Sequence, residues 1–195
     1  MNKIDLTSKC KASTQEIENI KNDMNSFCSV LKSEENLLSI SYDYAVIRLY
    51  KAFENFIFNI IVGDINQDSS QISDRFDVAF PKNLKKEICE FIVTKGNFFS
   101  LNGYGGLVNE LNTYLGYGND IYNVINKKKN KDTIMRLSAL RNFAAHENSQ
   151  SKKVVRTRLK IKRISSTGDW IRKQGRFEEL ANDVETIIKE IQATA

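Results

Sequence analysis

Apolar side chains recur every three or four residues along most of the chain, the spacing that places them on one face of an α-helix. This spacing predicts helices over residues of about 14–32, 37–62, 81–94, 105–115, 131–147 and 175–192. Ser13 and Glu16 have the spacing of a capping box at the start of the first helix. Gly63 is expected to end the second helix, and Pro81 suits the first position of the third. We therefore predict a mainly α protein, with residues 1–195 forming a single helical bundle.

The segments between these helices are predicted to be loops. Residues 64–74 are rich in Asp, Ser and Gln, and their aspartates do not have the spacing of a calcium-binding loop. Residues 98–119 contain five glycines but no Gly-Lys-Ser/Thr sequence, so turns explain them better than a nucleotide site. Residues 127–131 are expected to form a basic loop. Three tyrosines near these turns are expected to pack against the core: Tyr114, Tyr117 and Tyr122.

The region between the two C-terminal helices, residues 152–173, is read as a basic arm. Apolar and basic residues alternate roughly over 154–164, which suits a short β-hairpin or an irregular arm, and we expect the hairpin, with its turn at 165–168. Trp170 lies beside basic residues, so it can stack on a base or anchor a loop to the core, and we favour the anchor. Glu54 interrupts the apolar second helix, where a surface or capping contact is the simpler interpretation.

Composition narrows the class of protein. The chain is 41% hydrophobic and 27% charged, values typical of a globular protein. Its three cysteines are far apart and it has one histidine, which predicts reduced thiols and no metal site or cofactor. The N-terminal sequence Met-Asn-Lys-Ile-Asp-Leu contains no apolar signal core, and the longest apolar stretch, Phe56–Val62, is too short to span a bilayer. We expect a cytoplasmic protein with no membrane partner.

Positive charge is concentrated in one part of the chain. Residues 127–163 contain thirteen Lys or Arg and only two acidic residues, a local balance of +11 in a chain whose net charge is +5. Such a segment is either a solvated face or an electrostatic surface for a polyanion, and we favour RNA as the polyanion. The candidate RNA-binding residues are Lys127, Lys128, Lys129, Lys152, Lys153, Arg156 and Arg158.

The only histidine of the chain, His146, lies inside this basic region. Histidine changes charge near neutral pH and is the most frequent general acid or base. Arg141 and Asn142 precede it, so an anion-binding guanidinium and a small amide lie within six residues of the ring. On a straight helix Arg141 and His146 point about 140° apart and lie about 7.5 Å apart along the axis. They can act on one substrate if the helix ends near His146, or if a second copy supplies the complementary residue.

The sequence Arg141-Asn142-Phe-Ala-Ala-His146 resembles the Arg-x4–6-His signature of the HEPN superfamily, whose members include metal-independent ribonucleases. The resemblance implies a helical bundle that dimerises through the motif helix and cleaves RNA. Arg141, His146 and Asn142 would be its catalytic residues, with no cofactor. It also implies a toxin or a defence or stress ribonuclease, controlled by a protein antitoxin or regulator. Some HEPN toxins carry a tyrosine two residues after the histidine, and Asn148 here departs from that pattern.

Two other interpretations of the same residues stay open. The chain can be a non-catalytic HEPN-like module that binds RNA or dimerises, since the helices and basic residues would look the same. It can also be a plain scaffold, with His146 satisfied by carbonyl groups at the end of its helix.

Overall fold

The computed structural model describes residues 4–194 and contains ten α-helices and no β-strand within them. The mainly helical fold predicted from the sequence is therefore confirmed. The helices are α1 (Leu6–Val30), α2 (Glu35–Gln67), α3 (Ser70–Phe76), α4 (Lys86–Thr94), α5 (Gly103–Tyr114), α6 (Asp120–Asn126), α7 (Lys128–His146), α8 (Ser149–Leu159), α9 (Thr167–Ile171) and α10 (Arg176–Gln192).

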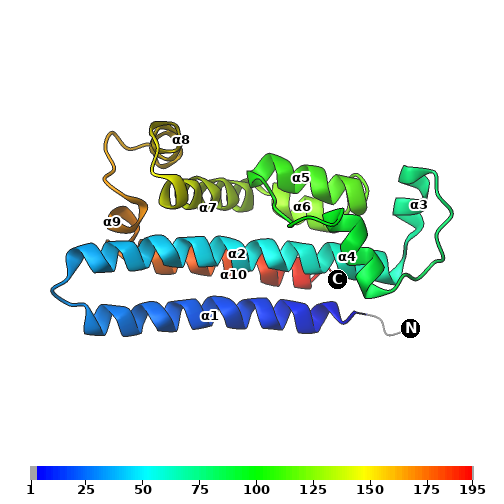
Figure 1. Cartoon of the computed structure of the whole chain (residues 1–195), viewed down its shortest axis with the longest axis horizontal. Helices are drawn as coiled ribbons and strands as arrows, with labels where there is room; N and C mark the ends of the chain where they lie inside the picture. The colour runs from blue at the N-terminus through cyan, green and yellow to red at the C-terminus, as the bar shows by residue number, and fades with distance from the viewer. Residues whose placement is uncertain (1–3, 195) are drawn as a thin grey trace.

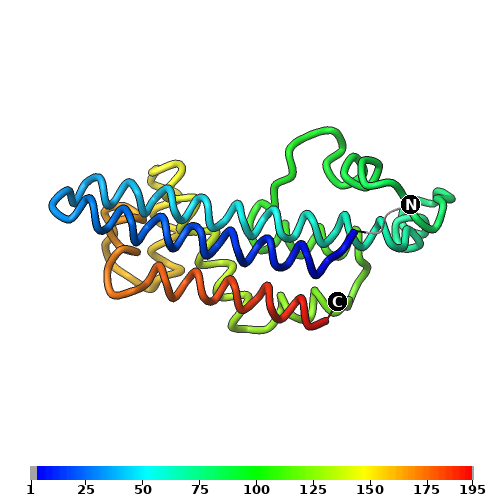
Figure 2. Tube along the Cα trace, turned by 90° about the horizontal axis from the view of Figure 1, so that it is seen from below, coloured from blue at the N-terminus to red at the C-terminus, as the bar shows by residue number. Residues whose placement is uncertain are grey.

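The 33-residue helix α2 is the central element of the fold. It forms a long hairpin with α1, and α10 packs along both of them (Figures 1 and 2). Helix α7 lies on the opposite side of α2 from α1, with α8 above it and α5 and α6 beside its N-terminal end (Figure 1). Helix α9 packs against the N-terminal half of α2. The motif helix is thus fixed to the longest helix of the bundle.

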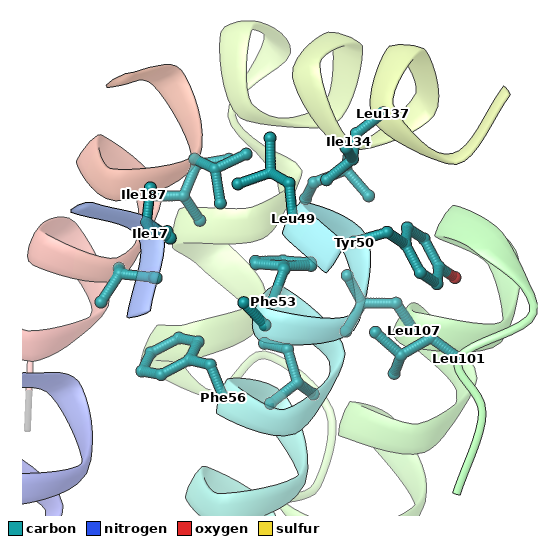
Figure 3. Packing of buried hydrophobic residues seen from close by; sticks show 14 of the residues in the cluster. Ile17, Leu49, Tyr50, Phe53, Phe56, Leu101, Leu107, Ile134, Leu137 and Ile187 are labelled. Carbon is teal, nitrogen blue, oxygen red and sulfur yellow. The ribbon is translucent and has the colours of Figure 1, made fainter. Parts of the chain in front are cut away.

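The hydrophobic core surrounds the middle of α2. Leu49, Phe53 and Phe56 of that helix are at most 1% exposed (Figure 3). Around them lie buried side chains from four other helices: Ile17 of α1, Ile187 of α10, Leu107 of α5, and Ile134 and Leu137 of α7. Since burying one such side chain contributes about 1.5–3 kcal/mol, this shared core holds α7 in a fixed position on α2.

The first two helices are longer than the sequence pattern predicted. Helix α1 begins at Leu6, because the carboxylate of Asp5 accepts a hydrogen bond from the amide of Thr7 (3.0 Å) and caps it. Ser13 lies inside this helix instead of capping it. Gly63 does not end α2, since its missing side chain leaves room for Leu6, whose Cδ2 would lie 2.3 Å from an added Cβ. The predicted polar loop over 64–74 is also wrong, because α2 continues to Gln67 and α3 begins at Ser70.

Two predicted boundaries nearer the middle of the chain are also corrected. Pro81 does not begin a helix, because the carbonyls of Pro81 and Lys82 are instead hydrogen-bonded to Ser69, between α2 and α3. The hydroxyl of Ser69 donates to the Pro81 carbonyl (2.7 Å), and the amide of Ser69 donates to the Lys82 carbonyl (2.9 Å). Helix α4 then begins at Lys86. The sequence pattern missed α6, and the predicted basic loop at 127–131 is largely the first turn of α7.

The predicted basic hairpin is wrong, since residues 149–159 form helix α8. The side chain of Asn148 caps this helix by accepting a hydrogen bond from the amide of Ser151 (2.8 Å). Ser151 and Val155, four residues apart, are its buried positions. One buried stripe leaves the remaining faces exposed, so local alternation of apolar and basic residues imitated a strand. The expected hairpin turn at 165–168 is also wrong, because Thr167 and Gly168 are the first two residues of α9.

The aromatic residues near the loops behave differently from one another. Tyr114 is 1% exposed, and its hydroxyl donates to the carbonyl of Ile92 (3.2 Å). Tyr117 is 82% exposed, so its predicted packing is wrong, while Tyr122 is partly buried. Trp170 packs against the core, which confirms it as an anchor, and the Arg176 guanidinium lies 4.5 Å from its ring centroid.

Within residues 4–194, no three His, Cys, Asp or Glu side chains are placed to hold a metal ion, and the three cysteines are free thiols. No helix in this part of the chain is long and apolar enough to cross a membrane.

Candidate functional site

The Arg141–His146 motif occupies the last turns of α7. His146 is the final residue of that helix and is exposed, as is Asn142, whereas Arg141 is half-buried. Glu147 ends the helix in the left-handed conformation, with a φ of 44°, and Asn148 caps α8 immediately afterwards. The helix therefore ends at the histidine, which is one of the two conditions under which Arg141 and His146 can act on one substrate.

The side chain of Arg141 is held by two contacts. Its guanidinium carbon lies 5.1 Å from the centroid of the Tyr50 ring, a cation–π contact. Its Nη1 donates to the Oδ1 of Asn142 (2.9 Å), so the amide contacts the arginine and not the histidine ring. The buried Nε–H of Arg141 has no acceptor among the described residues. The guanidinium is thus positioned before any anion arrives, with donors left to bind one.

Tyr50, on α2, is a site residue that no motif of the sequence indicated. Its hydroxyl accepts a hydrogen bond from the amide of Gly103, the first residue of α5 (3.3 Å). Burial raises the pKa of Tyr50, while that hydrogen bond lowers it. Because the hydroxyl is tied to α5 and the ring is buried, Tyr50 offers Arg141 a fixed surface. A tyrosine within an apolar stripe was the only signal in the sequence.

Glu54, one turn along α2 from Tyr50, holds the loop that leads into α5. It is 3% exposed, which corrects the expected surface contact. One carboxylate oxygen accepts from the amide of Leu101 (2.9 Å) and the other from the Lys51 ammonium (2.9 Å). A buried carboxylate is tolerated only when it is paired in this way. Glu54 therefore fixes Leu101, and with it the position of Gly103 against Tyr50.

Asp43, two turns before Tyr50 on α2, is a second acidic group close to the motif. Its carboxylate accepts a hydrogen bond from the amide of Gly168 in α9 (2.7 Å). Burial raises the pKa of Asp43 to about 6; the Gly168 hydrogen bond opposes this rise, and the nearby charge of Glu147 adds to it. Asp43 is thus a carboxyl group with a raised pKa on which the charge of Glu147, the residue that follows His146, acts. No feature of the sequence indicated it, because its partners are distant in the chain.

The seven candidate RNA-binding residues divide into two groups. Lys127 pairs with Glu190 (2.9 Å) and Lys129 with Asp183 (3.1 Å), so acidic residues of α10 offset both charges. The other five have no ion pair to a described residue: Lys128, Lys152, Lys153, Arg156 and Arg158. Four of these belong to α8, which contains no acidic residue. The helix that follows His146 is therefore an uncompensated cationic surface.

Apolar side chains are exposed on the first turns of α2. Leu37 is 48%, Ile40 62% and Tyr44 58% exposed, and their spacing places them on one stripe of the helix. Tyr44 directly follows Asp43 in the sequence, and the stripe lies on the first turns of α2. Contiguous exposed apolar residues of this kind mark contact surfaces more often than solvated ones.

Comparison of the chain with protein-family models, with curated proteins and with solved structures found no match.

Proposed function

We propose that the protein is a metal-independent endoribonuclease of the HEPN type, with Arg141, Asn142 and His146 as its catalytic residues. The observation that supports this most is the arrangement at the end of α7. An exposed histidine ends the helix, and one turn earlier an arginine is held on Tyr50 with donors to spare. The cationic helix α8 begins three residues after His146 and would attract the polyanion.

In the proposed reaction the 2′-hydroxyl of the RNA attacks the adjacent phosphorus, and the bond to the 5′-oxygen breaks. His146 takes the proton from the 2′-hydroxyl or supplies one to the leaving oxygen. Arg141 binds the phosphate oxygens and stabilises the charge that develops on them. Asn142, through its contact with the guanidinium, holds Arg141 in the orientation that phosphate binding needs.

Two proton transfers require two proton-transfer groups, and each chain has one histidine. A symmetric dimer would supply the second His146, and two-fold pairing is the commonest assembly of identical chains. The exposed stripe of Leu37, Ile40 and Tyr44 on the first turns of α2 supports such a pairing, because a second copy would cover it. The proposal also includes the homodimer and a cytoplasmic location, which rests on the cysteines and the apolar pattern of the sequence. Control by a protein antitoxin or regulator is proposed on the HEPN resemblance alone.

The test is RNA cleavage by the purified protein in excess EDTA. Wild type should cleave total RNA, and His146→Ala should be about 10²–10⁴-fold slower, the usual contribution of a positioned proton-transfer group. Arg141→Lys keeps the charge but loses the two-pronged contact with phosphate, so it should also be impaired. Lys11→Ala, an exposed change on α1, serves as the control. Equal cleavage by wild type and His146→Ala would refute the assignment.

A second candidate function is a non-catalytic RNA-binding module. The cations of α8 favour it, because they have no ion pairs and do not depend on His146. In that case a mobility-shift assay would show RNA binding by wild type and by His146→Ala alike, with no cleavage by either.

A further inference from the structure

A polar hollow of about 430 Å³ lies between α7, α8 and α10, and the proposed cleavage site does not use it. Its volume is within the range of about 300–1,000 Å³ that is usual for small-ligand sites. Helix α7 contributes most of the lining, the C-terminal end of α8 adds a second wall, and Asp183 comes from α10. We call it the α7–α8 hollow; its lining residues are Lys129, Asp132, Thr133, Met135, Arg136, Thr157, Arg158, Lys160 and Asp183.

The α7–α8 hollow opens on a different side of α7 from Arg141. Arg136, which lines it, precedes Arg141 by five residues. On an α-helix this separation corresponds to about 140° of rotation and about 7.5 Å along the axis. An anion in the hollow would therefore not occupy the position that Arg141 serves.

The charges that line the α7–α8 hollow favour the binding of an anion. Four cations and two carboxylates line the hollow, which leaves a formal charge of +2. Asp183 pairs with Lys129 (3.1 Å) and with Arg136 (2.9 Å), and Arg136 also pairs with Glu179 (3.3 Å). Arg158 and Lys160 form no ion pair with a described residue. These two side chains are free to bind a ligand.

The end of α8 would ordinarily oppose an anion, because the last carbonyl groups of a helix carry partial negative charge. Here the backbone amides that follow α8 donate hydrogen bonds to carbonyl groups of its last turn. Lys160 adopts the left-handed conformation, with a φ of 55°, and its amide donates to the carbonyls of Arg156 and Thr157. The amide of Ile161 also donates to the Arg156 carbonyl (3.1 Å). These carbonyl oxygens are therefore satisfied by the backbone, which reduces their effect on the hollow.

We propose that the α7–α8 hollow binds a phosphate group, with Arg158 and Lys160 as its principal ligands and Arg136 adding a third cation. A phosphate monoester carries a charge of about −1.5 to −2 near pH 7, which matches the formal charge of the lining. The phosphate can come from the backbone of an RNA or from a free nucleotide. With RNA as its source the proposal rests on the proposed function, as a second contact with the substrate; with a nucleotide it stands alone.

Binding is measured without cleavage, in the His146→Ala background and in EDTA. The probes are a fluorescently labelled single-stranded RNA of twelve nucleotides, followed by fluorescence polarisation, and AMP, followed by calorimetry. Arg158→Glu and Lys160→Glu are the test variants. Lys11→Glu and Lys153→Glu are the control variants. Both reverse one positive charge outside the hollow, Lys11→Glu on α1 and Lys153→Glu on the exposed face of α8. Circular dichroism checks that each variant is folded.

Loss of one charge-assisted contact should weaken binding about tenfold or more. If RNA is the source, Arg158→Glu and Lys160→Glu weaken RNA binding by that factor, Lys153→Glu weakens it less, and Lys11→Glu changes it less than about twofold. The slope of log affinity against log salt should also fall by about 0.7 for each lost contact with a single strand. If a nucleotide is the source, the parent protein binds AMP, and this binding is lost in Arg158→Glu and Lys160→Glu.

The proposal is overturned if neither probe distinguishes Arg158→Glu and Lys160→Glu from Lys153→Glu. If Lys11→Glu weakens RNA binding as much as Arg158→Glu and Lys160→Glu do, RNA is excluded as the source of the phosphate, because the change in net charge would then explain the effect. Cleavage by wild type is scored separately, so the proposed reaction and the hollow can each fail without the other. Arg158→Gln, which removes charge without reversing it, should give the same order of effects at smaller size.

Discussion

Gly168 is the residue whose replacement should most directly disturb the packing of α9 on α2. It is the second residue of α9 and is buried against the backbone of α2. A Cβ added there would lie 1.8 Å from the carbonyl oxygen of Ser39 and 3.0 Å from the amide nitrogen of Asp43. Both atoms belong to the backbone of the longest helix, so neither can rotate away. Gly168→Ala must therefore push α9 off α2.

The cost follows from the hydrogen bonds that hold α9 in place. A carbon atom and a carbonyl oxygen approach to about 3.3 Å at closest, so α9 has to move by more than about 1 Å. That movement stretches the bond from the Gly168 amide to Asp43 (2.7 Å) and the bond from the Thr167 hydroxyl to the carbonyl of Leu140 (2.9 Å). The first involves a charged group and the second a neutral one, so their loss costs roughly 2–4 kcal/mol.

The assay is urea denaturation followed by circular dichroism at 222 nm. Gly168→Ala should lower the free energy of unfolding by roughly 2–4 kcal/mol with little change in the denaturant slope. Gly105→Ala is the matched control, because no atom lies within 4 Å of its added Cβ and the residue is inside α5. That change should raise stability by about 0.5–1 kcal/mol. Equal stability of Gly168→Ala and wild type would show that the contact between α9 and α2 is looser than described.

Three further predictions concern the residues around the motif. Because the folded-state pKa of Asp43 is raised to about 6, the folded protein holds more protons than the unfolded chain between about pH 4 and 6, and its stability falls as pH rises through that window. Asp43→Asn should reduce this fall by up to about 3 kcal/mol, measured by urea denaturation at pH 4 and pH 7; an unchanged fall would contradict the assignment. Glu54→Ala leaves the Leu101 amide without an acceptor and should lower the free energy of unfolding by about 1–3 kcal/mol, whereas Glu54→Gln retains an acceptor and should lower it less. Equal losses of stability in thermal or urea denaturation would argue against the hydrogen bond. Tyr50→Phe keeps the aromatic ring under Arg141 and should keep most RNA cleavage, while Tyr50→Leu removes the ring and should lose more of the cleavage activity. The reverse order in a cleavage assay in EDTA would argue against the cation–π contact.

Long helices with a continuous apolar stripe could be predicted from the sequence. The last helix was expected over 175–192 and is observed over Arg176–Gln192, because its buried positions recur without interruption. The motif helix was also found, although it begins three residues earlier than expected. In both cases the signal is local, since the spacing of apolar residues alone defines the buried face.

The sequence-based predictions that proved wrong concern segments whose structure depends on residues distant in the chain. Gly63 would end an isolated helix, yet α2 passes through it because Leu6 fills the space beside it. Helix α8 buries a stripe of only two positions, Ser151 and Val155, too few to be distinguished from alternation. The contact between Tyr50 and Arg141 joins residues about ninety positions apart, which no local pattern contains.

The position of α10 has a consequence for synthesis of the protein. The hairpin of α1 and α2 is made first, and α10, which covers it, is the last of the helices within residues 4–194 to be made. The ion pair between Lys21 and Glu185 (2.8 Å) closes a separation of 164 residues. Until α10 has emerged from the ribosome, Ile17 and Phe53 lack part of their cover. Between the synthesis of α2 and that of α10, the nascent chain therefore presents an apolar hairpin, and that hairpin is a natural substrate for chaperones that bind exposed apolar segments.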